Sequence, residues 1–260
     1  LTGTAGLGTD AIIDAVHQGR RLPILLLPAI FLGTILTHLC GGSAGREGAA
    51  LQMGGTIGQF LGRNFRMDDR DLRVATLAGM AAFFSALFGT PMAATVFALM
   101  VISIGVIYHA ALYPSLLAAL VAYGVSVYLG VESTRFAVSV PAQSAGMFVR
   151  VAVLGVLCAL VSILFCKVMH GTEHLMEKIR NPWLRVVCGG VIVIVLTWIF
   201  GTDYNGAGMD VIQRALNGQA NGWAWLLKLL FTAITIGCGF KGGEVVPSFF
   251  VGAAFGCWVG

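Results

Sequence analysis

Long apolar runs alternate with short charged connectors along this chain. Each run has few or no charged residues and approaches the ~20 residues that a helix needs to cross the hydrocarbon core of a bilayer. The basic residues in the connectors, for example residues 63–73 and 167–185, are typical of segments on the cytoplasmic side of a membrane. The pattern therefore predicts an all-α polytopic membrane protein, with spans near residues 22–40, 74–88, 91–108, 111–129, 148–168, 183–200 and 223–238.

Composition supports the same class. Of the 260 residues, 57% are hydrophobic and 11% are charged, whereas soluble domains carry about 25% charged residues. This balance excludes a water-soluble globule and a disordered chain, and the net charge of +4 is too small to indicate a nucleic-acid partner. Because the chain begins at Leu1 and ends at Gly260 inside an apolar run, we expect it to be the central part of a longer protein.

Glycine is unusually frequent and clusters directly ahead of apolar segments. A helix that starts at such a cluster would begin inside the membrane, where irregular backbone is tolerated only against protein or a water-filled cavity. Broken helices whose positive N-terminal ends converge are a common way to bind an anion at that depth. We therefore expect helix starts and an anion site after the clusters Gly6 and Gly8, Gly41 to Gly48, Gly206 and Gly208, and Gly237 to Gly243.

Two of these clusters repeat in the same order. The segment GLGTDAIIDAV (residues 6–16) is matched by GAGMDVIQRAL (residues 206–216), and GREGAALQMGGTIG (residues 45–58) is matched by GGEVVPSFFVGAAFG (residues 242–256). Duplicated halves that each supply a broken helix are common in transporters. We therefore expect two partial repeat halves, residues 1–147 and 148–260.

Two of the twelve carboxylates lie at the glycine-flanked start of an apolar segment, namely Glu47 and Glu244. An ionisable side chain within a membrane is costly and indicates an ion or proton pathway. Glu47 is the stronger candidate for a group that exchanges a proton. If both it and Arg46 are helical, Arg46 is expected to point elsewhere, because neighbours in sequence do not share a helix face. Glu244 is interpreted as a helix cap.

The segment GGSAGREGAALQMGGTIGQFLG resembles the signature of the CLC family of chloride channels and anion/proton antiporters. GLGTD, GGEVVP and AAFFSALFGTPMAATVFAL resemble further motifs of that family, so the similarity covers most of the chain. The resemblance implies an inverted-repeat bundle of broken helices, a homodimer without cofactor or metal, and Glu47 as the glutamate that gates the anion path and transfers protons. It also implies that the anion site includes Gly6, Leu7, Gly8, Gly45, Arg46, Gly48, Ala49, Gly243, Glu244, Val245 and Val246.

Several departures from the chloride-type motifs fall on that site. Leu7 replaces a coordinating serine, Val245 replaces a phenylalanine, and Met100 and Val101 stand where chloride/proton antiporters have an internal proton glutamate. These changes resemble the bacterial fluoride/proton antiporter branch, which implies fluoride/proton antiport in the inner membrane of a bacterium. A chloride-conducting channel or a chloride/proton exchanger remains the alternative.

Three other sequence features suggest alternative roles. HGTEH (residues 170–174) fits the pattern of a zinc hydrolase in which two histidines hold the metal, although its place at the end of a span favours a solvated helix end. GLGTDA fits a loose dinucleotide fingerprint, but no strand precedes it. Lys228, inside an apolar run, is expected to reach toward the membrane surface as a snorkelling residue.

Overall fold

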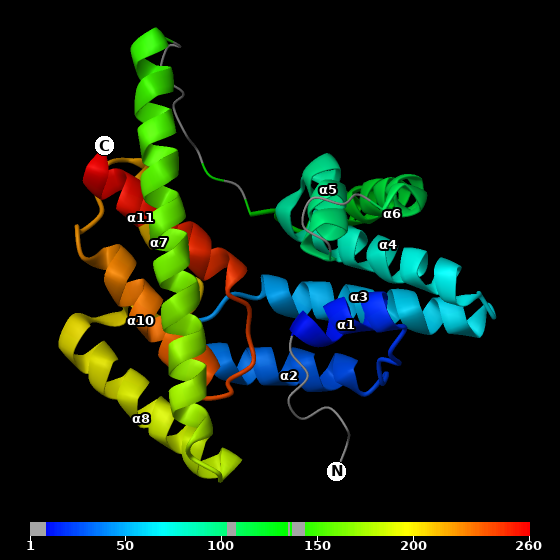
Figure 1. Cartoon of the computed structure of the whole chain (residues 1–260), viewed down its shortest axis with the longest axis horizontal. Helices are drawn as coiled ribbons and strands as arrows, with labels where there is room; N and C mark the ends of the chain where they lie inside the picture. The colour runs from blue at the N-terminus through cyan, green and yellow to red at the C-terminus, as the bar shows by residue number, and fades with distance from the viewer. Residues whose placement is uncertain (1–8, 103–107, 135, 137–143) are drawn as a thin grey trace. The chain divides into compact units, whose positions relative to one another are not determined.

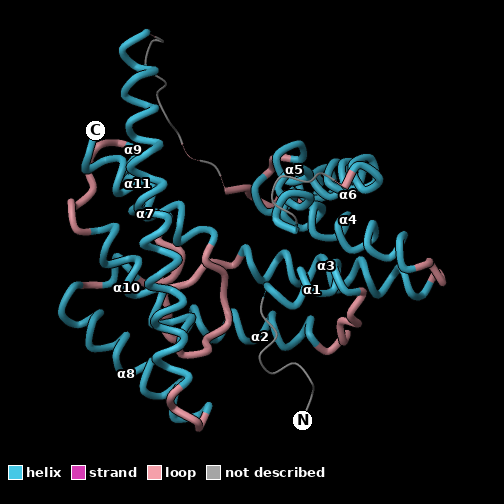
Figure 2. Tube along the Cα trace, viewed as in Figure 1, coloured by secondary structure: helices cyan, strands magenta, loops and turns pink. Residues whose placement is uncertain are grey.

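The computed structural model describes residues 9–102, 108–134, 136 and 144–260, and this part of the chain is helical (Figures 1 and 2). Among the described residues, Gly45 and Gly243 form an isolated antiparallel β-bridge. The elements are α1 (Thr9–Gln18), α2 (Leu26–Leu39), α3 (Glu47–Asn64), α4 (Asp69–Phe88), α5 (Pro91–Ile102), α6 (His109–Tyr128), α7 (Ala145–Glu177), α8 (Pro182–Phe200), η1 (Thr202–Tyr204), α9 (Met209–Leu216), α10 (Ala224–Gly237) and α11 (Val245–Val259).

The chain forms two compact units. Unit 1 comprises residues 1–33 and 47–135, and unit 2 comprises residues 34–46 and 136–260. The chain thus leaves unit 1 within α2, contributes the end of α2 and the connector before α3 to unit 2, and then returns to unit 1 at Glu47.

In unit 1, α3 and α4 lie side by side with their backbones in close contact (Figure 1). Gly54 and Gly58 on α3 are four residues apart and therefore share a helix face. A Cβ atom at Gly54 would collide with the carbonyl oxygen of Gly79 on α4, and one at Gly58 would collide with that of Ala75. Small residues at this spacing allow helices in a membrane to approach closely, so glycine is required at these contacts.

The core of unit 1 is apolar and includes residues from α1, α3, α4, α5 and α6. Phe84 on α4 stacks on Phe97 of α5 with ring centroids 4.4 Å apart. Gln59 on α3 fixes the turn after α1, because it accepts a hydrogen bond from the Leu22 backbone N–H (2.7 Å) and donates one to the Arg20 carbonyl (2.9 Å). The buried amide thus satisfies backbone groups that lack a helical partner.

In unit 2, α10 contacts α7, α8, α11 and η1, and α11 also contacts α7 and α9. The face between α7, α10 and α11 is apolar and includes Phe165, Leu229 and Val251. Another face of α10 is polar and buried, with Lys228, Thr232 and Thr235 each 0% exposed. This helix therefore has two kinds of contact within unit 2, one apolar and one hydrogen-bonded.

Among the described residues, α4, α6, α7 and α8 are long and apolar enough to cross a membrane, and α2, α5, α10 and α11 are shorter apolar helices. In α7, which has 33 residues, Phe165 and Met169 are the buried positions, while valines such as Val149 and Val156 are more than half exposed. Apolar exposure on this scale is typical of a surface in contact with lipid. The predicted class, an all-α polytopic membrane protein, is confirmed, and its apolar helices include both membrane-length and shorter ones.

Candidate anion-binding site

Helices begin directly after the glycine clusters, as the sequence predicts. α3 starts at Glu47, α9 at Met209 and α11 at Val245, and α1 is described from Thr9 onward. The first four N–H groups of a helix have no acceptor within it and carry the positive end of its dipole, so each start offers donors to an anion. Three residues of the predicted anion site, Gly6, Leu7 and Gly8, lie outside the described residues.

Glu47, the first residue of α3, is 0% exposed. Both of its carboxylate oxygens are shielded from solvent, and Gly48 and Ala49 after it are buried as well. Burial disfavours the ionised carboxylate, whereas the N-terminal end of a helix favours it. Arg46, directly before α3, is exposed.

Two predicted site residues from distant parts of the sequence meet in unit 2. The Gly45 N–H donates to the Gly243 carbonyl and the Gly243 N–H donates to the Gly45 carbonyl, both at 2.7 Å. This bridge joins the connector before α3, residues 40–46, to the connector before α11, residues 238–244. The approach is close enough that a Cβ atom at Gly242 would collide with the Cβ atom of Ala44.

The start of α11 differs from that of α3 in the exposure of its glutamate. Glu244 occupies the N-cap position of α11 with an exposed side chain, and that side chain makes no capping hydrogen bond. Its interpretation as a helix cap is therefore wrong: its φ of −97° and ψ of −8° are helical, whereas capping residues usually have extended backbone angles. Val246 is 1% exposed and Val245 is half-buried.

Lys241 is a cation near the predicted site that the sequence reasoning missed. It lies in the connector before α11, two residues ahead of Gly243, and it is half-buried. Burial lowers the pKa of its ammonium group below the usual value of 10.5. A lysine placed directly before the two glycines of GGEVVP was the available signal, because a cation beside an anion path raises the local anion concentration.

Lys228 does not reach toward the membrane surface, so the snorkelling prediction is wrong. It is 0% exposed and its Nζ donates to the carbonyl oxygens of Tyr204 (3.1 Å) and Gly206 (2.6 Å). The ammonium also lies 5.2 Å from the centroid of the Phe250 ring. These acceptors lie at the end of η1 and in the connector between η1 and α9, and a buried lysine with such partners holds this segment to α10.

The HGTEH segment does not form a metal site. The Nδ1 atom of His170 donates to the Cys166 carbonyl at 2.8 Å, one turn back on α7, and His174 pairs with Glu177 at 3.9 Å. Over the ranges that the structure describes, no three His, Cys, Asp or Glu side chains gather where a metal ion would bind. The zinc-hydrolase alternative therefore has no support in the geometry of these residues.

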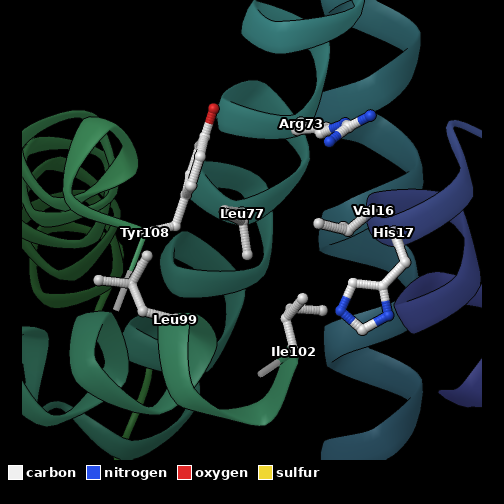
Figure 3. Close-up of a pocket in the computed structure, with 7 residues that line it drawn as sticks. All are labelled: Val16, His17, Arg73, Leu77, Leu99, Ile102 and Tyr108. Carbon is white, nitrogen blue, oxygen red and sulfur yellow. The ribbon is translucent and has the colours of Figure 1, made fainter. Parts of the chain in front are cut away.

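Unit 1 contains a pocket lined by residues of α1, α4 and α5 and by Tyr108. The cavity measures about 190 Å³, and Leu99 and Ile102, which flank Met100 and Val101 in sequence, are among its walls. His17 from α1, Arg73 from α4 and Tyr108 bring polar groups to an otherwise apolar lining (Figure 3). No Asp or Glu is among the described residues that line it.

These features define a class of protein before any comparison is made. Membrane-length helices, shorter apolar helices that begin after glycine-rich connectors, and a fully buried glutamate at one such start are the features of a membrane transporter for a small ion.

Comparison with known proteins names the family. The whole chain, residues 1–260, matches the family described as "Voltage gated chloride channel". The chain therefore belongs to the voltage-gated chloride channel (CLC) family, which consists of membrane transport proteins and not of enzymes.

Individual relatives narrow the similarity. The "Chloride/fluoride channel protein" of Pseudomonas syringae pv. tomato is 36% identical over 260 residues, covering 96% of this chain and 57% of the relative. The "Crystal structure of a CLC-type fluoride/proton antiporter" has a TM-score of 0.90 and 36% identity, covering 96% of this chain and 64% of that one. A "slow cyanobacterial Cl-/H+ antiporter" has a TM-score of 0.79 and 22% identity, covering 95% and 60%; this last likeness concerns the fold.

The chain spans 57% of the length of the Pseudomonas syringae relative and 64% of the length of the fluoride/proton antiporter chain. The fold identified from the sequence motifs, a CLC-type bundle with broken helices, is confirmed by the structural match.

Proposed function

We propose that the protein exchanges fluoride for protons across the membrane, and that Glu47 is the group that both gates the anion path and carries the proton. The observation that carries this proposal is the complete burial of Glu47 at the start of α3. A carboxylate in that position replaces an anion at the helix N-terminus when ionised and releases the position when protonated. Each turnover then couples one kind of ion to the other.

Fluoride is favoured by the relatives and by chemistry. Two relatives at 36% identity are described by name as a chloride/fluoride channel protein and a fluoride/proton antiporter. Fluoride is small and strongly hydrated, so it needs close hydrogen-bond donors, and helix starts flanked by glycine allow the backbone to approach it. The proposed donors are backbone N–H groups near Gly8, Gly48, Ala49, Val245 and Val246.

Other parts of the proposed site shape the path. Gly45 and Gly243 join two connectors through their bridge, and Arg46 supplies an exposed cation beside Glu47. Leu7 and Val245 replace polar or aromatic residues of the chloride-type motifs, and we propose that they tune selectivity. Gly6, Gly8 and Glu244 complete the set by their place in the motifs.

The wider setting follows the family. We propose that residues 1–147 and 148–260 derive from duplicated halves, with α1 and α9 as equivalent short helices after equivalent glycine motifs. We further propose a homodimer in the inner membrane of a bacterium. Crosslinking of the protein in native membranes tests the dimer: a single crosslinked species of twice the subunit mass supports it, and an exclusive monomer contradicts it.

Transport in proteoliposomes tests the central proposal. The full-length protein is reconstituted, and fluoride or chloride efflux is recorded together with internal pH. Fluoride movement tied to opposing proton movement supports antiport. Chloride flux without a pH change would instead support the alternative of a chloride channel, and coupled chloride movement would support a chloride/proton exchanger.

A further inference from the structure

The buried polar face of α10 consists of Lys228, Thr232 and Thr235. These residues are four and three positions apart, so they lie on one side of the helix, and each is 0% exposed. The rest of the helix is predominantly apolar. Because a buried polar group is costly unless it is hydrogen-bonded, the partners of this face indicate why α10 retains it.

The two threonines hold Ser43, which is itself 0% exposed. The Thr235 hydroxyl donates to the Phe231 carbonyl (2.8 Å), and its oxygen accepts a hydrogen bond from the Ser43 backbone N–H (3.0 Å). The hydroxyls of Thr232 and Ser43 are joined at 3.0 Å. The backbone and the side chain of Ser43 are thus both tied to one helix.

Lys228 holds the neighbouring connector in the same way. Its ammonium donates to the carbonyls of Tyr204 and Gly206, and the Gly206 N–H donates to the Gly42 carbonyl at 3.0 Å. The residue before Ser43 is therefore linked to α10 through Gly206. Close packing reinforces this arrangement, because a Cβ atom at Gly42 would lie 3.1 Å from the Thr235 Cγ2 atom.

We propose that this polar face is a positioning element for the gate, in which Lys228, Thr232 and Thr235 set the backbone of residues 42–46 and thereby the place of Glu47, four residues beyond Ser43. The inference rests on the proposed role of Glu47. A carboxylate that alternates between two states must return to the same place in each cycle, and small displacements of such groups are costly. A loosened connector lets anions pass without an exchanged proton, so the coupling ratio falls more than the anion flux.

Replacement of Thr235 by valine tests the contact, because valine keeps the shape and removes the acceptor. In the reconstituted full-length protein, we expect Thr235→Val to lower the number of protons moved per fluoride by about half or more, since one buried hydrogen bond at the connector is lost. Thr235→Ser retains the hydroxyl and is expected to restore the ratio. Thr76→Val is the matched control: Thr76 is 1% exposed, and its hydroxyl donates to the Leu72 carbonyl of its own helix.

Hydrogen–deuterium exchange provides a readout that does not depend on transport. In Thr235→Val, the amide of Ser43 loses its acceptor, so exchange in residues 40–46 should accelerate by about tenfold, while Thr76→Val leaves that segment unchanged. If the wild-type protein does not couple fluoride to protons, the proposed function fails, and the exchange experiment still decides whether α10 fixes the connector.

Two results would overturn the inference. In the first, residues 40–46 of the Thr235→Val variant exchange hydrogen for deuterium at the same rate as in the wild-type protein. In the second, these residues exchange faster but the number of protons moved per fluoride is unchanged, so that the contact has only a structural role. Ser43→Ala provides a second variant if Thr235→Val does not fold. It keeps the Ser43 N–H and removes the hydroxyl contact with Thr232, so a smaller change in the same direction is expected.

Discussion

Two glutamates, one at the start of α3 and one directly before α11, have similar neighbours in sequence but differ in their exposure to solvent. Each connector is rich in glycine, and each glutamate lies at or directly before the start of an apolar helix. Glu47 is 0% exposed, whereas Glu244 is exposed. The motif alone therefore does not decide which carboxylate is suited to gate an ion path.

Burial changes what a carboxylate does. Burial disfavours the ionised form of a carboxylate and so favours its protonation unless another charge or a hydrogen-bond donor compensates, whereas an exposed carboxylate is stabilised as an anion by water. Ala44 and Ala49, close to Glu47 in the chain, are 0% and 3% exposed, although Arg46 directly before it is exposed. After Glu244, Val246 is buried but Ser248 and Phe249 are exposed. Substitutions at the two helix starts should therefore have unequal effects.

Removal of the two carboxylates should have unequal results. Glu47→Gln cannot exchange a proton, so we expect proton movement to be abolished while fluoride still passes. Glu244→Gln should change the coupling ratio by less than about twofold, because an exposed carboxylate is screened by its surroundings. Parallel recordings of fluoride efflux and internal pH measure both. Normal coupling in Glu47→Gln would contradict the role assigned to it.

The contact between the two connectors should be intolerant of added volume. Gly242→Ala places a Cβ atom against Ala44 beside the bridge between Gly45 and Gly243, and we expect it to lower the free energy of unfolding by about 1–3 kcal/mol. Gly252→Ala is the control, since nothing lies within 4 Å of its new Cβ atom. Thermal unfolding in detergent compares the two variants, and equal midpoints would argue against a tight bridge.

Selectivity should respond at the start of α11 and not at its end. Val245→Phe restores the aromatic residue of the chloride-type motif, and we expect the ratio of chloride to fluoride flux to rise by several-fold, about the effect of reshaping one apolar contact. Val259→Phe, on the last residue of the same helix, is the control. An unchanged ratio in Val245→Phe would mean that the motif alignment at this residue is wrong.

Substitution of Lys241 should have the smallest effect on anion flux, and this effect should depend on pH. Burial lowers its pKa, so its charge is present below the lowered pKa and is lost as pH rises through it. Lys241→Met is therefore expected to reduce anion flux by about twofold at neutral pH, with a smaller difference from wild type at higher pH. Lys178→Met, which removes an exposed lysine, is the control. A difference that grows with pH would contradict this account.

The same lysine penalises folding while it is charged. Because the folded protein releases the Lys241 proton at lower pH than the unfolded chain does, its contribution to stability improves as pH rises from the lowered pKa toward 10.5. Lys241→Met should therefore unfold at a slightly higher temperature than wild type at neutral pH, and this difference should narrow toward pH 10.5.

Much of the fold follows from local sequence. The runs predicted at residues 183–200 and 223–238 agree closely with α8 and α10. The length of an apolar run and the polar residues at its ends are local properties of the sequence, so they can be recognised without knowledge of the fold. Asn181, for example, accepts a hydrogen bond from the Trp183 N–H at the start of α8, as a helix N-cap does. Within the candidate site, the positions at which helices begin, directly after the glycine clusters, were predictable for the same reason.

Other parts of the site were not predictable in this way. Lys228 in an apolar run is interpreted from sequence as a snorkelling residue, and only the folded chain supplies the carbonyls of Tyr204 and Gly206 that bind it. The polar face of α10 likewise has its partner only in the folded chain, because Ser43 lies 189 and 192 residues away from Thr232 and Thr235 in sequence.

The sequence by itself determined the membrane class, the breaks at glycine and the family, because hydropathy, backbone freedom and motifs are properties of short stretches of chain. The tertiary structure decided that Glu47 is buried and Glu244 exposed, and that Gly45 meets Gly243. The physical reason is that burial and buried hydrogen bonds are produced by segments far apart in sequence, so similar glycine-flanked glutamates acquire different chemistry only when the chain has folded.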